Sequence, residues 1–252
     1  MDFDGATVLL QWAVGGLAFC WVTTRHQLLG IGYGWLLRGV WGLTALGGLV
    51  VGLRTDTVPV REAAALGVVL ATLVALVVSV RLKDKGPKGL PRWLDLPAPL
   101  IGIIGLVAAG VDAGGPDALA VARIVVGAAF LGAITDAMLL GHWYLVQPGL
   151  TRDPLYELLT MSTVLWFPEV LVLLWPVGMV SVINGTIDDG YGGMLGWFWV
   201  MSAVTTIVLL VVTRLALREK QYSAVMAATG LLYLAILTAA GTDLVARALL
   251  AS

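Results

Sequence analysis

Five side chains that could do chemistry stand inside or beside apolar stretches of this chain: Asp136, Glu169, Arg25, His26 and His142. An ionisable side chain at the centre of a membrane helix costs at least about 2.5–3.5 kcal/mol, so such residues usually serve a function. Buried carboxyl and imidazole groups can exchange protons near neutral pH. We therefore predict that Asp136, Glu169, Arg25 and His26 form a charge site on a proton path.

The composition indicates which elements position these residues. Of the 252 residues, 59% are hydrophobic and 12% are charged, against roughly 25% charged in soluble proteins, and the mean hydropathy is +0.94. Apolar runs of about 20 residues, the length that crosses a membrane as a helix, recur along the chain. The fold class predicted is all-α integral membrane, with eight transmembrane helices at 6–35, 38–53, 62–82, 97–113, 118–147, 155–183, 192–215 and 222–248.

Basic residues predict the orientation of these helices. The connection at residues 81–92 is the most basic one, and residues 214–220 add three more basic side chains. Short loops rich in Lys and Arg remain on the cytoplasmic side. After eight crossings both termini then face outside, and we expect an integral protein of a prokaryotic plasma membrane.

An internal repeat is indicated by three pairs of matching segments in the same order. Residues 24–33 and 135–144 share Thr, Leu-Leu-Gly and Tyr at the same spacing, and residues 108–112 and 239–243 share Ala-Ala-Gly-x-Asp. Between them, residues 77–82 and 211–215 both run from Val-Val through a hydroxyl residue to Arg-Leu. We interpret this as a duplicated four-helix unit. Two parallel repeats would then be related by a pseudo-two-fold axis along the membrane normal, and they would form one compact domain from residues 1–117 and 118–252.

The repeat predicts how deep the charges lie. Asp136 lies roughly 18 Å from the inner helix end, Glu169 lies roughly 20 Å from it, and the alignment places Arg25 at the same depth. An Arg25–Asp136 ion pair would then offset the insertion cost, either as part of the proton path or only to fix the helix register. Arg123 and Arg247 stand near outer helix ends, where we expect their long side chains to reach toward water.

A second group, His142, Trp143, Tyr144 and Arg152, stands toward the cytoplasmic side. It has two interpretations: an interfacial aromatic belt, or a ligand-binding pocket in which a quinone stacks on the rings while His142 exchanges a proton. His26 and His142 could also be axial ligands of a b-type haem. The repeat places them roughly 7–8 Å apart in depth, however, which favours a quinone over haem as the cofactor.

Several classes of function are disfavoured by the sequence. It contains no Walker loop, no dinucleotide fingerprint, no nucleophile elbow and no zinc-protease motif. A net charge of −1 without a basic patch argues against nucleic acid. A compact metal site is not expected, because Asp136 and His142 stand about 120° apart around a helix.

Two classes of function remain, and neither names a reaction, so enzymatic activity stays open. The first is a membrane subunit of a respiratory or redox assembly that provides a proton path and a quinone pocket. Its partners would be the lipid bilayer and other membrane subunits, or further copies of the chain in a homo-oligomer. The alternative is a proton-coupled transporter of a small solute or ion, for which duplicated halves are suitable. A b-type haem protein is the second alternative.

Overall fold

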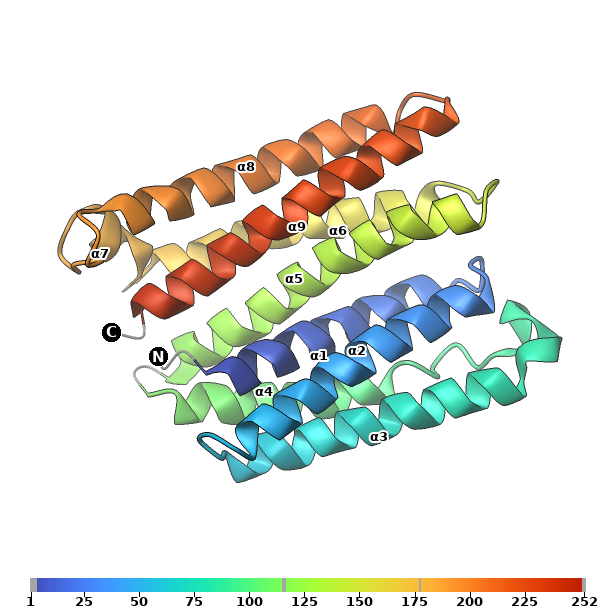
Figure 1. Ribbon diagram of the computed structural model, residues 1–252, viewed down its shortest axis with the longest axis horizontal. Helices are drawn as coiled ribbons and strands as arrows, with labels where there is room; N and C mark the ends of the chain where they lie inside the picture. The colour runs from blue at the N-terminus through green and yellow to red at the C-terminus, as the bar shows by residue number, and fades with distance from the viewer. Residues whose placement is uncertain (1–3, 115–116, 177, 251–252) are drawn as a thin grey trace.

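A computed structural model describes residues 4–114, 117–176 and 178–250, and all the regular secondary structure in these ranges is helical. Its long helices lie side by side along one axis, and both termini are at the same end of the molecule (Figure 1). The α-helices of the described residues are α1 (Gly5–Thr24), α2 (Ile31–Gly52), α3 (Pro59–Arg81), α4 (Pro97–Asp112), α5 (Asp117–Val146), α6 (Asp153–Leu174), α7 (Met179–Ile183), α8 (Met194–Ala216) and α9 (Tyr222–Leu250). Two 3₁₀ turns, η1 (Lys83–Lys85) and η2 (Pro87–Gly89), connect α3 to α4.

Seven of these helices are long and apolar enough to cross a membrane: α1, α2, α3, α5, α6, α8 and α9. The class predicted from composition, an all-α integral membrane protein, is confirmed at this level. The helix α4 has 16 residues and returns the chain alongside α3 to the end where the termini lie. We call that end the terminal end, and the opposite end, which carries residues 82–96, the basic-loop end.

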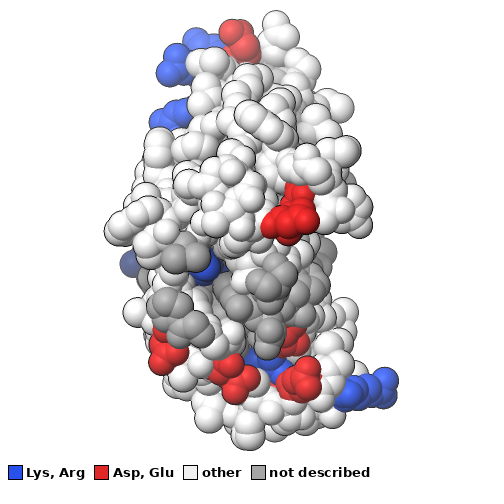
Figure 2. Space-filling view, turned by 90° about the vertical axis from the view of Figure 1, so that its left-hand side faces the viewer, with Lys and Arg blue, Asp and Glu red and all other residues white. Residues whose placement is uncertain are grey.

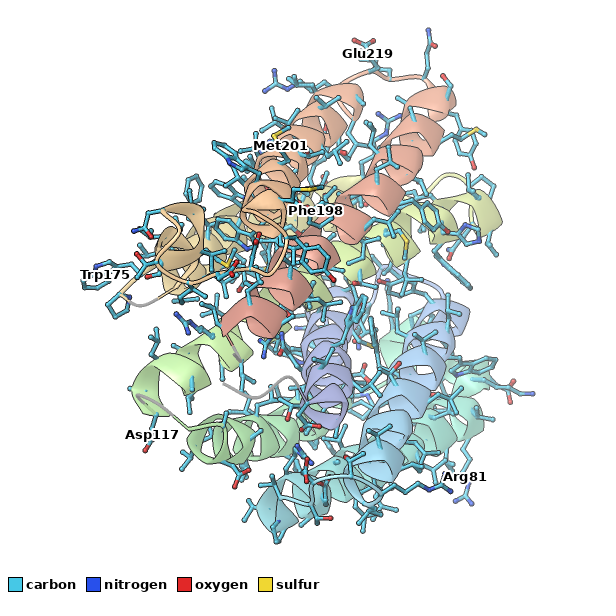
Figure 3. The ribbon with its side chains drawn as sticks, turned by 60° about the vertical axis from the view of Figure 1, so that its left-hand side comes forward. Arg81, Asp117, Trp175, Phe198, Met201 and Glu219 are labelled. Atoms are coloured by element: carbon cyan, nitrogen blue, oxygen red, sulfur yellow. The ribbon has the colours of Figure 1, made fainter. Side chains whose placement is uncertain are left out.

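The outer surface of the bundle is suited to lipid. Trp175, Phe198 and Met201 are 67%, 53% and 60% exposed, and Trp175 projects from the edge of the bundle (Figure 3). Charged residues stand at the two ends instead, with Asp117 at the terminal end and Arg81 and Glu219 at the basic-loop end. This separation is what an apolar solvent around the middle of the molecule requires.

The helices pack as two groups of four that meet along α5. In the first group α1 and α3 each contact α2 and α4, and in the second α5 and α8 each contact α6 and α9. The groups join where α5 lies against α1 and α4. A Cβ atom on Gly15 would overlap the Ala128 carbonyl, and one on Gly132 would overlap the Gly15 backbone. Glycine at both positions lets α1 and α5 approach closely, as small residues do in membranes.

The prediction of one helix over 6–35 is wrong. The helix α1 ends at Thr24, and α2 begins at Ile31, seven residues before the predicted start of the second helix. Between them Gln27 adopts a left-handed φ of 56°, and its side chain donates to the Leu90 carbonyl at 2.8 Å. A polar turn anchored to the neighbouring loop therefore interrupts the apolar run.

The prediction of one helix over 155–183 is also wrong. The helix α6 ends at Leu174, and Trp175 is extended, with φ −140° and ψ 153°. The cause is Pro176, which lacks an N–H for the helix and disfavours helical backbone in the residue before it. Pro168, in contrast, lies within a continuous α6. The other six predicted helices agree with the structure to within about three residues, the usual uncertainty of such edges, apart from the start of α2.

Asp189 organises the loop between α7 and α8. Its carboxylate accepts backbone N–H bonds from Gly193 at 2.8 Å, Tyr191 at 3.0 Å and Leu195 at 2.8 Å. These donors, that of Gly193 foremost, lower the pKa of Asp189 below its usual value, because they favour the charged form. The arrangement anchors the first turn of α8, whose N–H groups lack helical partners.

Candidate functional site

Asp136 lies on α5 in the core between the two helix groups and is 0% exposed. Its Oδ1 accepts a hydrogen bond from Trp41 Nε1 at 2.9 Å. Its Oδ2, like the hydroxyl of Tyr33, has no hydrogen-bond partner among the described residues. Tyr33 is close enough to interact electrostatically with Asp136. Gly16 makes this geometry possible, because a Cβ atom there would overlap the Trp41 indole. We call Asp136, Trp41 and Tyr33 the Asp136 site.

The predicted Arg25–Asp136 ion pair is wrong. Arg25 Nη2 instead lies 2.8 Å from one Glu157 oxygen, and His26 Nε2 lies 2.9 Å from the other. The Arg25 and His26 side chains are 30% and 39% exposed at the basic-loop end. Because α1 stops at Thr24, both basic groups reach the end of the bundle and avoid the cost of desolvation. Neither residue belongs to the Asp136 site.

A buried ion pair that the sequence interpretation missed lies between the Asp136 site and the basic-loop end. Arg38 of α2 donates to both oxygens of Asp95, at 2.6 and 2.8 Å, and the side chains are 2% and 3% exposed. Thr24 also donates to Asp95, at 2.7 Å. The available signal was an arginine in the middle of the apolar run at 31–52.

A small cavity adjoins this ion pair. It has a volume of about 30 Å³ and is lined by Arg38, Asp95, Thr24 and Gln27, among others. Arg38 Nη1 is buried and has no hydrogen-bond partner in the described part of the chain. A polar cavity of this size is large enough for a water molecule, which could satisfy such a donor. Polar groups therefore extend from the basic-loop end into the bundle as far as Arg38.

A second buried cluster lies toward the terminal end. Arg247 Nε donates to Asp243 at 2.8 Å within α9, and Gln11 Nε2 of α1 donates to the same carboxylate at 3.3 Å. Arg247 Nη2 also donates to the Arg123 carbonyl at 3.3 Å. Arg123 and Arg247 were expected to reach toward water, but they are only 6% and 4% exposed, and Arg247 adjoins water through a cavity at the terminal end.

Glu169 belongs to this cluster and not to the Asp136 site. It is 0% exposed and interacts electrostatically with Asp243 and Arg247, but neither of its oxygens has a hydrogen-bond partner in the described ranges. The prediction that Glu169 lies level with Asp136 is therefore wrong. We call Gln11, Arg123, Glu169, Asp243 and Arg247 the terminal-end cluster.

Two local features of the backbone position the terminal-end cluster. A Cβ atom on Gly127 would stand 2.5 Å from Gln11 Nε2 and 2.7 Å from Asp243 Oδ1, so glycine lets both side chains rest on α5. Arg123 Nε donates to the Val172 carbonyl at 2.8 Å. That carbonyl lacks its usual helical partner, because the residue four positions later is Pro176.

An apolar layer separates the two sites. Gly127, beside the terminal-end cluster, stands nine residues before Asp136 on α5, which is roughly 14 Å along the helix. Between these levels Phe130, Leu131 and Ile134 are all 0% exposed. The carboxyl groups predicted to form one site thus lie at two depths with hydrocarbon between them.

The terminal-end cluster borders a larger cavity at the surface. This cavity has a volume of about 240 Å³, and its lining includes Asp4, Arg61, Asp112 and Arg247. It has room for several water molecules at about 30 Å³ each. Acidic side chains gather on this face of the molecule (Figure 2). Through Arg247, the buried cluster is in contact with a space that opens at the terminal end.

The group predicted to bind a quinone is divided by the structure. His142 is exposed on α5, whereas the Trp143 ring packs against Tyr33, with the ring centroids 6.0 Å apart and the planes tilted by 58°, and Trp143 donates to Gln147 at 3.1 Å. The Tyr144 hydroxyl donates to a backbone carbonyl in the next loop. Arg152 donates to four carbonyls that follow α8: those of Leu217, Glu219, Lys220 and Gln221. Polar atoms of these three residues thus hold loops together, and the quinone pocket stays a prediction.

Comparison with known proteins adds no family to this geometry. No protein-family model matches the chain, and no curated protein and no solved structure matches it significantly. The function is therefore inferred from the sites themselves.

Proposed function

We propose that this chain moves protons across the membrane through Asp136 and the terminal-end cluster, as a membrane subunit of a redox assembly. The observation that carries the proposal is the state of two acids: Asp136 and Glu169 are fully buried and have carboxyl oxygens without hydrogen-bond partners among the described residues. A bare carboxylate in such surroundings is costly, so it requires a proton or a bound water. Groups that take up and release a proton are what a relay needs.

The polar groups approach these acids from both ends of the molecule. From the basic-loop end, the small cavity beside Arg38 and Asp95 would be the start of a path toward Asp136. From the terminal end, the larger cavity meets the terminal-end cluster at Arg247. The apolar layer between the two sites would prevent a steady leak of protons. Passage would then require waters that a membrane potential draws into this layer, and in the assembly a redox reaction in a partner subunit would supply that driving force.

The orientation and the duplication are part of the proposal. All four lysines stand in the loops at 82–96 and 217–221 of the basic-loop end, which supports a cytoplasmic location for that end. Eight crossings, with α4 as the shortest, would place both termini outside. The shared packing order of the two helix groups supports repeats at 1–117 and 118–252. This support from packing does not depend on the alignment of residues 24–33 with 135–144, in which a turn would correspond to a helix.

The proposal is tested by proton flux in liposomes. The protein is purified with the membrane partners that remain bound, reconstituted, and driven by a potassium diffusion potential while a dye reports internal pH. Asp136→Asn keeps the size of the side chain and the acceptor for Trp41 but cannot carry a proton. We expect flux in the native protein, its loss in Asp136→Asn, and normal flux in the control Asp84→Asn at the exposed basic loop. Native flux in Asp136→Asn would refute the proposal, as would an absence of flux in the native protein.

A proton-coupled transporter is the second candidate, and the terminal-end cavity favours it. Arg61, Asp112 and Arg247 all line this cavity, so a small solute with charges of both signs would find complementary groups there. Proton flux that appears only when a solute is added would support this function. Co-purified cytochrome or iron–sulfur subunits would support the redox assembly, and a b-type haem spectrum from the chain alone would support the haem alternative.

A further inference from the structure

A groove unrelated to the proton path lies at the basic-loop end, between the last turn of α1 and the segment before α4. Its volume is about 400 Å³, and its lining residues are Trp21, Arg25, His26, Arg92, Trp93 and Leu96. Three of the six are basic or titratable to a cation, two are tryptophans, and none is acidic. The groove is held in shape where Trp21 Nε1 donates to the Arg92 carbonyl at 3.1 Å.

The groove carries an excess of positive charge. Arg92 is exposed, and no ion pair of its side chain is found among the described residues. Arg25 and His26 share a single carboxylate, that of Glu157. The Arg25 guanidinium also lies 4.9 Å from the centre of the Trp21 ring, a cation–π contact that fixes it at the groove wall. Further cations stand along residues 81–88, beginning with Arg81 at the edge of the molecule (Figure 3).

The two tryptophans place the groove at the level of lipid headgroups. Trp21 stands in the last turn of the membrane helix α1, and Trp93, which is 64% exposed, lies just before α4. Tryptophan gathers at the boundary between the hydrocarbon and the headgroups. In that position the charged side of the groove would face the phosphate layer, and Trp93 and Leu96 would face the first carbons of the acyl chains.

We propose that this groove binds the headgroup of an anionic phospholipid, with Arg92 and Arg25 donating to the phosphate. A guanidinium presents paired donors that match phosphate oxygens, and basic pockets at the cytoplasmic membrane surface are suited to phosphorylated headgroups. Arg25 and His26 thus acquire a ligand-binding role at the interface. This inference rests on the orientation proposed above, with the basic-loop end cytoplasmic, and not on the proton path.

The test compares lipids and two arginines at the same end of the molecule. The purified protein in zwitterionic nanodiscs is titrated with phosphatidylglycerol, and bound lipids are counted by native mass spectrometry alongside the melting temperature. We expect Arg92→Gln to weaken binding by about tenfold, the effect of one charge-assisted hydrogen bond. Arg218→Gln, also exposed at this end but outside the groove, should leave binding unchanged.

Two results would overturn the proposal. Equal losses in Arg92→Gln and Arg218→Gln would mean that the lipid responds only to net charge. Competition by inorganic phosphate at millimolar concentration would mean that a free anion, and not a lipid, is the ligand. Trp93→Ala provides an independent variant, because it removes the apolar contact and leaves every charge in place. It should weaken phosphatidylglycerol binding while the protein remains folded.

Discussion

Two arginine–carboxylate pairs toward the basic-loop end, one buried and one exposed, allow the effect of burial on the strength of an ion pair to be measured. Arg38 and Asp95 are joined by two hydrogen bonds, and their side chains are 2% and 3% exposed. Arg25 and Glu157 are joined by one hydrogen bond, and their side chains are 30% and 27% exposed. In each pair the arginine is changed to glutamine, the acid to its amide, and then both together, so that a double-mutant cycle isolates the coupling energy.

The structure predicts unequal coupling energies. Arg38→Gln would leave the buried Asp95 carboxylate with the Thr24 hydroxyl as its main donor, and breaking a buried pair in this way costs about 3–5 kcal/mol. The double variant restores neutrality, so we expect a coupling energy of about 2–3 kcal/mol. For the Arg25–Glu157 pair, which water reaches, we expect about 0.2–1 kcal/mol.

The measurement is the free energy of unfolding in a mild detergent, followed by tryptophan fluorescence during a denaturant titration at constant detergent concentration. Raising the salt concentration provides an internal control, because it should weaken only the exposed pair. Equal coupling energies for the two pairs would refute the reasoning, since they would show that burial does not determine the strength of these interactions.

Three further outcomes follow from local geometry. Gly127→Ala should destabilise the protein by about 1–3 kcal/mol, because the new methyl group would displace side chains of the terminal-end cluster from α5. Gly230, which has open space around it, provides the control: Gly230→Ala should be neutral or stabilising in the same unfolding assay. Trp41→Phe removes the donor to Asp136 and should cost about 1–3 kcal/mol, whereas an unchanged midpoint would argue against that hydrogen bond. The pKa of Asp189 is lowered on folding. Asp189 therefore stabilises the folded loop above its unfolded pKa of about 3.9, and this stabilisation is lost as the pH falls through the folded pKa. Limited proteolysis of the α7–α8 loop should therefore accelerate below about pH 4. In the Asp189→Asn variant, the rate at which the loop is cleaved should no longer depend on pH in that range.

The sequence alone determined the class of the protein and most of its helices. Apolar runs of about 20 residues have the length of a membrane helix, in which the backbone forms all its hydrogen bonds internally. Asp136 and Glu169 were recognisable as buried acids because they stand inside such apolar runs. The starts of α4 and α9 at Pro97 and Tyr222 agree with the prediction, since proline and charged loops mark helix boundaries.

Only the tertiary structure decided which charges meet. The cost of a charge in hydrocarbon can be read from one helix, but its partner depends on packing between residues far apart in the chain. Arg25 was expected beside Asp136, yet the turn at Gln27 moves it to Glu157 at the end of the bundle. Conversely, Arg247 stands near a helix end, and its position in the sequence alone predicted that its side chain would reach water. The close approach of α1 and α5 instead encloses it with Asp243 and Gln11, 232 residues apart in the chain.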